Sequence, residues 1–183
     1  FTLDGSHAVQ TMVVAITSGD RVIISEDTRL RTYSLAGTAG WESTAITGEP
    51  VEDPQGNLYG RSPTQGAVAS VTSAGVLRWT RTVGTQRAYV DFIGDDGIAY
   101  VREGAYIHGL STQDGSILWS INTGGDLCTG LTLGRGGRLY AGRCSGWRTL
   151  YDTVIDYADS AWPRVNGNRR NTRKSGDRFS VKF

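Results

Sequence analysis

Residues 96–119 read DGIAYVREGAYIHGLSTQDGSILW, and this stretch decides the fold. Two Asp-Gly pairs, Asp96-Gly97 and Asp114-Gly115, each precede a short apolar run. Asp-Gly supplies the positive φ angles of tight hairpin turns, so the stretch predicts antiparallel strands at residues 98–101, 105–110 and 116–119. A further β-rich run at residues 89–93 adds a strand in front, which gives one unit of four short strands.

The same unit recurs along the chain with a period of about forty residues. A turn followed by an apolar strand occurs at residues 19–24, 55–59, 96–100 and 136–140, and Trp41, Trp79 and Trp119 follow each other at intervals of 38 and 40 residues. Four short strands per forty residues is typical of a propeller blade, whereas helical repeats need a periodicity that this density of glycine would break. We therefore expect an all-β chain of four-stranded antiparallel β-propeller blades, about four in number, at residues 11–47, 48–87, 88–127 and 128–183.

Residues 96–101 and 106–119 resemble the quinoprotein-like (PQQ-like) repeat, in which an apolar strand, an apolar-polar strand and a small turn lead to Gly-x-x-x-Trp. Residues 161–173, AWPRVNGNRRNTR, are similar to a Trp-Pro…Asn-Thr-Gly-Arg element that flanks such propellers, with Arg173 in place of the glycine. Propellers of this family usually have seven or eight blades. The resemblance thus implies that the chain is part of a larger ring, completed by a second copy or by the rest of the propeller as a separate chain. A compact four-bladed ring is the alternative.

The family includes quinone-dependent dehydrogenases that use calcium and adjacent cysteines, whereas Cys128 and Cys144 here are sixteen residues apart. Only two histidines, His7 and His108, are present, and no phosphate-binding loop is found. We expect no cofactor and no enzyme activity. The expected function is a bacterial, non-catalytic binding or scaffold module with a protein partner, by analogy with the propeller lipoprotein of the outer-membrane barrel assembly machinery. A fragment of a propeller enzyme and a carbohydrate-binding propeller remain alternatives, the latter with Trp147, which breaks the tryptophan period, as the stacking residue.

Cys128 and Cys144 are the only cysteines, and they are symmetric about residue 136, at the centre of the turn at residues 135–137. Strands joined by that turn would place the two Cβ atoms about 5 Å apart, close enough for a cross-strand disulfide. Buried thiols are the alternative. A disulfide would indicate an extracytoplasmic location, in the periplasm, at the cell surface or secreted. The chain also has no apolar run long enough for a transmembrane segment.

The C-terminal segment carries the one charge asymmetry. Residues 164–183 contain seven cations, among them Arg164, Arg169, Arg170 and Arg173, against Asp177 alone, although the whole chain has a net charge of only +1. These arginines are candidates for a ligand or partner surface, and a solvated loop before a last strand at residues 178–183 is the favoured interpretation. Nucleic acid is not expected as a partner, because an oxidising compartment argues against it.

Overall fold

The computed structural model describes residues 13–26, 28–134 and 138–151. Every strand in this part of the chain belongs to an antiparallel sheet, and none of the described residues is helical. The strands of the first two sheets are β1 (Val13–Ile16), β2 (Arg21–Ser25), β3 (Leu30–Ser34) and β4 (Ala39–Ser43), then β5 (Thr47–Glu52), β6 (Leu58–Arg61), β7 (Ala67–Val71) and β8 (Leu77–Thr82). Those of the last two are β9 (Ala88–Ile93), β10 (Ile98–Glu103), β11 (Tyr106–Ser111) and β12 (Ile117–Asn122), then β13 (Thr132–Leu133), β14 (Arg138–Arg143) and β15 (Gly146–Tyr151).

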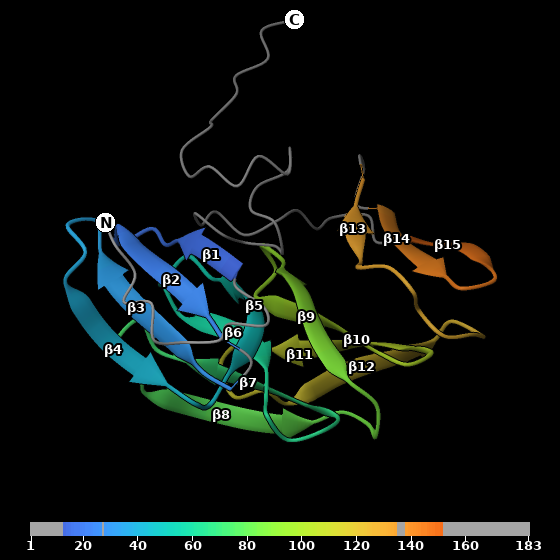
Figure 1. The fold of residues 1–183 in the computed structure, drawn as a ribbon. Coiled ribbons are helices and arrows are strands. Elements are labelled where there is room, and N and C mark those ends of the chain that lie inside the picture. Colours follow the sequence, from blue (N-terminus) through green and yellow to red (C-terminus); the bar gives the residue numbers. More distant parts are fainter. Residues whose placement is uncertain (1–12, 27, 135–137, 152–183) are drawn as a thin grey trace, which may run out of the picture.

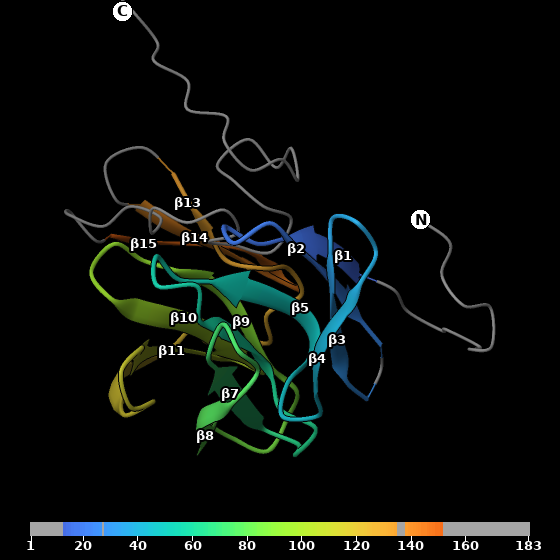
Figure 2. The same cartoon turned by 90° about the vertical axis from the view of Figure 1, so that its left-hand side faces the viewer.

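Each sheet is built from strands that follow one another in the sequence, so each is a simple meander. The sheets stand beside one another like blades, with β4, β8 and β12 at the outside (Figure 1) and the second sheet between the first and the third (Figure 2). The turns that join first to second and third to fourth strands lie at one end of the blades, here called the turn face. The opposite end, the loop face, carries the second-to-third turns and the connections between sheets. The predicted four-stranded units are confirmed in the first three sheets.

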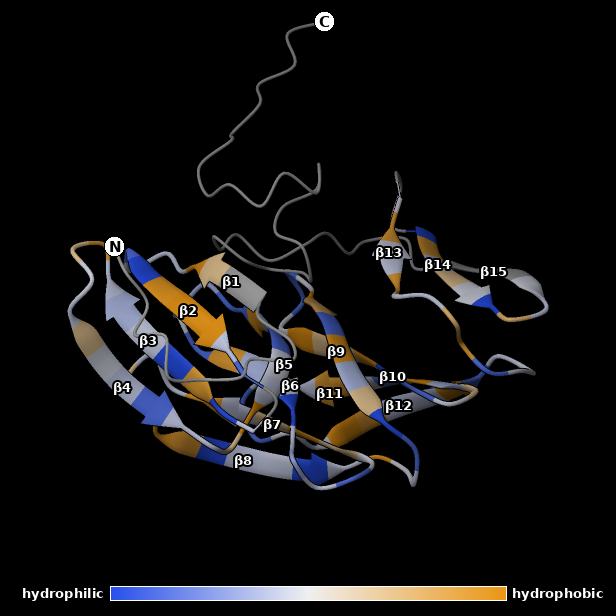
Figure 3. Cartoon of the chain, in the orientation of Figure 1, coloured by the Kyte–Doolittle hydropathy of each residue, from blue (hydrophilic) through white to orange (hydrophobic). Residues whose placement is uncertain are grey.

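The hydrophobic core lies between neighbouring sheets. One cluster, including Ile23, Leu58 and Val71, joins the first sheet to the second, and another, including Tyr59, Trp79 and Val101, joins the second to the third. A third cluster packs Phe92 and Tyr100 of the third sheet against the fourth. Figure 3 shows the hydrophobic stretch of β2 that contributes to the first of these contacts. Each sheet buries equivalent positions against its neighbours. This packing of sheet against sheet accounts for the repeat period seen in the sequence.

Trp41 and Trp79 fasten neighbouring blades at the turn face. The Trp41 indole nitrogen donates to the carbonyl oxygen of Ser73 at 2.8 Å, and that of Trp79 donates to the carbonyl oxygen of Thr112 at 3.2 Å. In each case the indole covers a glycine of the next sheet, and a Cβ built on Gly115 would lie 2.6 Å from the Trp79 ring. Both tryptophans therefore pack one blade against the next.

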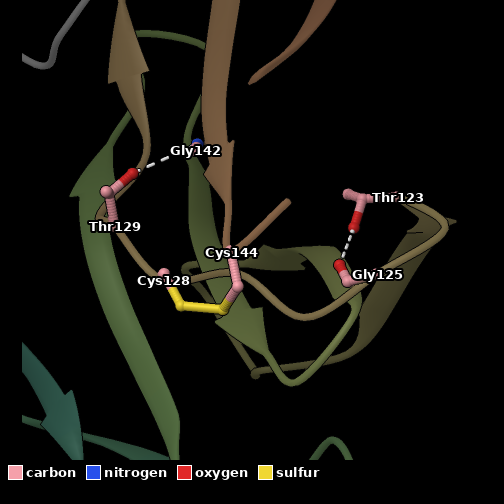
Figure 4. Close-up of a disulfide and its surroundings, with 6 residues drawn as sticks. All are labelled: Thr123, Gly125, Cys128, Thr129, Gly142 and Cys144. Carbon is pink, nitrogen blue, oxygen red and sulfur yellow. Dashed lines mark hydrogen bonds between the residues drawn. A yellow bond between two sulfur atoms is a disulfide. The ribbon is translucent and has the colours of Figure 1, made fainter. Parts of the chain in front are cut away.

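The fourth sheet contains the disulfide between Cys128 and Cys144, whose Cα atoms are 5.1 Å apart (Figure 4). Leu133 pairs with Leu139, as expected for a turn centred on residue 136. The expectation that Cys128 lies in the strand is wrong, because β13 has only two residues and Cys128 precedes it. Both cysteines are exposed, which also excludes buried thiols.

Candidate functional site

Hollows open at both faces of the blades in the part of the chain that the structure describes. The loop-face hollow has a volume of about 450 Å³ and is lined by Arg61, Gln65 and Arg87 among others. The turn-face hollow, of about 290 Å³, lies between the first and second sheets and is lined by Arg21, Trp41 and Glu52 among others. We take the turn-face hollow as the candidate site, because it combines an aromatic ring, a cation and a buried carboxylate.

Trp41 forms one wall of the turn-face hollow. It lies in β4, and its hydrogen bond to Ser73 fixes the ring across the gap to the second sheet. Gly75 makes this position possible, because its φ of +81° suits glycine and a Cβ there would lie 2.6 Å from the indole. The indole is therefore held in place and only partly buried, so a bound group can reach it.

Two charged residues complete the hollow. Glu52 is buried at the end of β5, and its carboxylate accepts hydrogen bonds from the backbone nitrogen of Ser18 at 3.1 Å and from the Ser18 hydroxyl at 2.8 Å. Arg21 lies at the start of β2, and its Nη1 is 2.9 Å from the place where a Cβ on Gly40 would stand. Gly40 thus leaves the space that the Arg21 guanidinium occupies.

The corresponding region between the second and third sheets is filled by a buried polar cluster. The Tyr59 hydroxyl donates to Asp53 at 2.6 Å and accepts a hydrogen bond from Arg78 Nη1 at 2.8 Å. The Tyr59 and Trp79 rings have their centroids 5.8 Å apart. Burial and the Asp53 carboxylate raise the pKa of Tyr59, so its phenol stays neutral.

Asp91 and Asp96 are close in sequence, but they do not act as a pair of catalytic carboxylates. Each has a separate structural role. Asp91 is buried and ion-pairs with Arg102 at 3.0 Å, and it accepts a hydrogen bond from the backbone nitrogen of Leu131 at 3.0 Å. Burial raises its pKa to about 6, against the opposing effect of Arg102. Asp96 accepts hydrogen bonds from the Tyr100 hydroxyl and the Ile98 backbone nitrogen in its turn. Asp91 thus ties the third sheet to the segment that leads into the fourth.

His108 and Ser120 form a pairing that resembles a nucleophile with its base. It is buried on β11, opposite Ser120 of β12, and its Nδ1 is 2.8 Å from the Ser120 hydroxyl. Burial lowers its pKa. In a catalytic triad the second imidazole nitrogen is held by a carboxylate. Among the described residues, no partner contacts His108 Nε2, so we interpret the pair as a structural cross-strand contact.

The other sequence-predicted site residues are only partly placed. Trp147 lies in β15 opposite Gly142, but its side chain is outside what the structure describes. Arg164, Arg169, Arg170 and Arg173 lie outside the described residues altogether. Within the described ranges there is no group of three metal-binding side chains, and no helix is long and apolar enough to cross a membrane. The sequence analysis did not find Arg21 and Glu52. Only a comparison of the first repeat unit with the second could have indicated them.

Comparison with known proteins identifies the class. No family model and no curated protein matches the chain. Among solved structures, BamB from Moraxella catarrhalis has 20% identity and a TM-score of 0.60, over 75% of this chain and 41% of that protein. The computationally designed Ika4 protein has 12% identity and a TM-score of 0.58, over 82% of this chain and 95% of that one.

The chain therefore has a β-propeller fold, as the four-stranded units predicted. It spans less than half the length of BamB. At this level of identity the likeness shows the fold alone, and the quinoprotein-like repeat family stays a resemblance.

Proposed function

We propose that the chain is a non-catalytic propeller module that binds a protein partner at its turn face, in an extracytoplasmic compartment. The observation that carries this proposal is the turn-face hollow, where the fixed Trp41 indole, the Arg21 guanidinium and the buried Glu52 carboxylate converge. Aromatic residues and arginine are enriched at the centres of protein interfaces, where they contribute most of the binding energy. The likeness in fold to BamB supports a scaffold role, and the exposed disulfide supports an oxidising location.

A displayed library of random peptides tests the proposal. The library is selected against the wild-type chain, and the enriched peptides are then measured against Trp41→Ala and against Gln65→Ala, which alters the loop-face hollow. We expect binding to fall about tenfold or more for Trp41→Ala, since truncation of an interface hot spot costs at least that much, and to stay unchanged for Gln65→Ala. Peptides that bind both variants and the wild type equally would contradict a turn-face site, and a selection that enriches nothing would contradict a peptide-binding module.

We propose further that the protein partner includes the missing part of the ring, as a second copy or a separate chain. The support is that the chain provides four repeat units and spans 41% of BamB. Light scattering on the purified chain measures its mass in solution. A dimer supports closure by a second copy, and a larger assembly formed only with another chain supports the alternative. A monomer that stays monomeric in every preparation would refute both.

A further inference from the structure

The three contacts between neighbouring sheets use one equivalent position in the second strand of each sheet. The residues at this position are Ile23, Tyr59 and Tyr100. They pair with Thr32, Ser70 and Gly109, which are equivalent to one another in the third strands. In the second and third sheets this position holds a tyrosine, whose ring packs near Trp79 or Trp119. In the first sheet it holds isoleucine, which has neither an aromatic ring nor a hydroxyl group.

The surroundings of the Tyr59 hydroxyl show what this position normally contains. Its partners are Asp53 in the first turn of the sheet, Arg78 beside Trp79, and the Thr112 carbonyl oxygen of the next sheet at 3.2 Å. Arg78 in turn donates to the Ser70 hydroxyl at 3.0 Å. The phenol and the guanidinium together fill the space between the two sheets at the turn face.

The turn-face hollow lies at the same place between the first and second sheets. Its lining includes Thr17, Thr32, Trp41 and Ser73. These are the counterparts, in order, of the residues that surround the Tyr59 hydroxyl and Arg78, namely Asp53, Ser70, Trp79 and Thr112. The equivalence of the turns is direct, because the backbone nitrogen of Thr17 donates to the residue four positions later, as that of Asp53 does.

The cation is also present, although it comes from a different strand. Gly40 precedes Trp41 as Arg78 precedes Trp79, and the Arg21 guanidinium lies over Gly40. The hollow therefore keeps the indole, the guanidinium and the accepting carbonyl of the second interface. Two components of the second interface are missing here from the described residues: the phenol ring, and the Asp53 carboxylate, which Thr17 replaces.

We propose that the turn-face hollow binds a phenolic side chain, a tyrosine of the partner protein, in place of the ring that Tyr59 supplies at the next interface. This inference rests on the proposed function and names the chemistry of its partner. The ring packs against the Trp41 indole, the hydroxyl accepts a hydrogen bond from Arg21, and it donates to the Ser73 carbonyl oxygen. A volume of about 290 Å³ is at the lower end of small-molecule sites and suits one aromatic side chain.

Nuclear magnetic resonance titration of the labelled chain with N-acetyl-tyrosinamide tests the proposal. We expect shifts of the Trp41 indole and Ser73 backbone signals. N-acetyl-phenylalaninamide should bind about tenfold more weakly, because it has no hydroxyl to accept a hydrogen bond from Arg21 or to donate one to the Ser73 carbonyl oxygen. N-acetyl-leucinamide should give no such shifts. Equal binding of all three amides, or no binding of the tyrosine amide, would overturn the proposal.

Ile23→Tyr provides the sharpest variant, since it supplies the ring from the chain itself and should abolish binding of the tyrosine amide. Arg21→Gln changes an exposed side chain, so it keeps the proposal testable if Ile23→Tyr does not fold. This variant should bind the tyrosine amide and the phenylalanine amide equally well. Leu35→Ser, at an exposed position just after β3, is the matched control and should bind as the wild type does. Tyrosine binding that survives Ile23→Tyr in a folded protein would refute the site.

The two proposals fail in different ways. Library peptides that bind through Trp41 but contain no tyrosine would refute the phenol site and leave the protein-binding function standing. Binding of the tyrosine amide without any enriched peptide would refute the peptide-binding module and leave the phenol site in place.

Discussion

Removal of the disulfide should loosen the fourth sheet selectively. Cys128 and Cys144 are separated by sixteen residues, and cross-linking a loop of this size stabilises the folded state by about 3 kcal/mol in the chain-entropy description. Both cysteines are exposed, so the double variant Cys128→Ser/Cys144→Ser buries no new polar group and its cost is mainly the lost cross-link. The sheet has few other restraints, because β13 has two residues and the apolar contact to Phe92 and Tyr100 comes mainly from Leu131, Leu139 and Ala141.

Hydrogen exchange measures this effect strand by strand. A loss of about 3 kcal/mol should speed exchange of the β14 amides on the order of 100-fold, with a much smaller change in β9 to β12. Reduction of the wild-type chain should reproduce the pattern, and Ser145→Ala, beside the disulfide, should leave it unchanged. Unaltered exchange in β14 of the double variant would refute the reasoning, because it would show that other contacts hold the sheet without the cross-link.

Three further predictions concern packing and pH. Gly115→Ala should lower the free energy of unfolding in urea by about 3 kcal/mol, because the φ of +71° disfavours alanine and the new Cβ would meet the Trp79 ring. Gly48→Ala, with a φ of +77° and open space around the new Cβ, should lower it by only about 1 kcal/mol. Equal losses in the two variants would contradict the ring contact. Burial raises the pKa of Asp91 from 3.8 to about 6 in the folded chain, so the native state binds its proton more tightly and the contribution of Asp91 to stability should fall as pH rises from about 4 to 6. Asp91→Asn should remove this contribution in urea titrations across that range. His108 has a lowered pKa, so its own contribution to stability should fall as pH drops below 6.5 and oppose that of Asp91 where the two ranges overlap; a pH dependence that is unchanged in His108→Gln would exclude this contribution.

The fold could be predicted from the sequence because the contact between blades needs a tryptophan in one blade and a glycine in the next. Trp79 can cover the next turn only if Gly115 stands there without a side chain, and the turn itself needs glycine for its positive φ. Tryptophan and glycine therefore recur with the same period, and that period is visible without any structure. The disulfide could be predicted because Cys128 and Cys144 are symmetric about residue 136, and the pairing of Leu133 with Leu139 has the register expected for that symmetry.

The extent of the strand before Cys128 could not be predicted in the same way. The segment between β12 and β13 contains three glycines, Gly124, Gly125 and Gly130, and its backbone pairs with β14 only through scattered bonds such as the one from Cys128 to Gly142. Pairing of this kind gives no alternating pattern of apolar residues. Leu127 pairs with Arg143, two residues out of register with the pair of Leu133 and Leu139, so the cysteines meet across an irregular segment and not within a continuous ladder.

The candidate site could not be predicted from any single unit, because it is defined by a difference between units. Arg21 looks like an ordinary polar residue at the start of a strand, and only the structure shows that its guanidinium lies over Gly40, the counterpart of Arg78. The useful signal in the sequence was the isoleucine at position 23, where the next two units have Tyr59 and Tyr100. Alignment of the units by their tryptophans would have revealed it.

The same difference explains why this interface is a better candidate for function than the others. If the first unit had simply lost its tyrosine, an apolar side chain filling the space would be the stable outcome, because an unfilled hollow forfeits packing energy. Instead Trp41 is held open by its bond to Ser73, and Gly40 leaves room for a charged guanidinium at the rim. Beside the apolar core of this interface, an open hollow lined by polar and aromatic groups is unfavourable for a fold that only needs to be stable, and it is favourable where a partner supplies the missing ring.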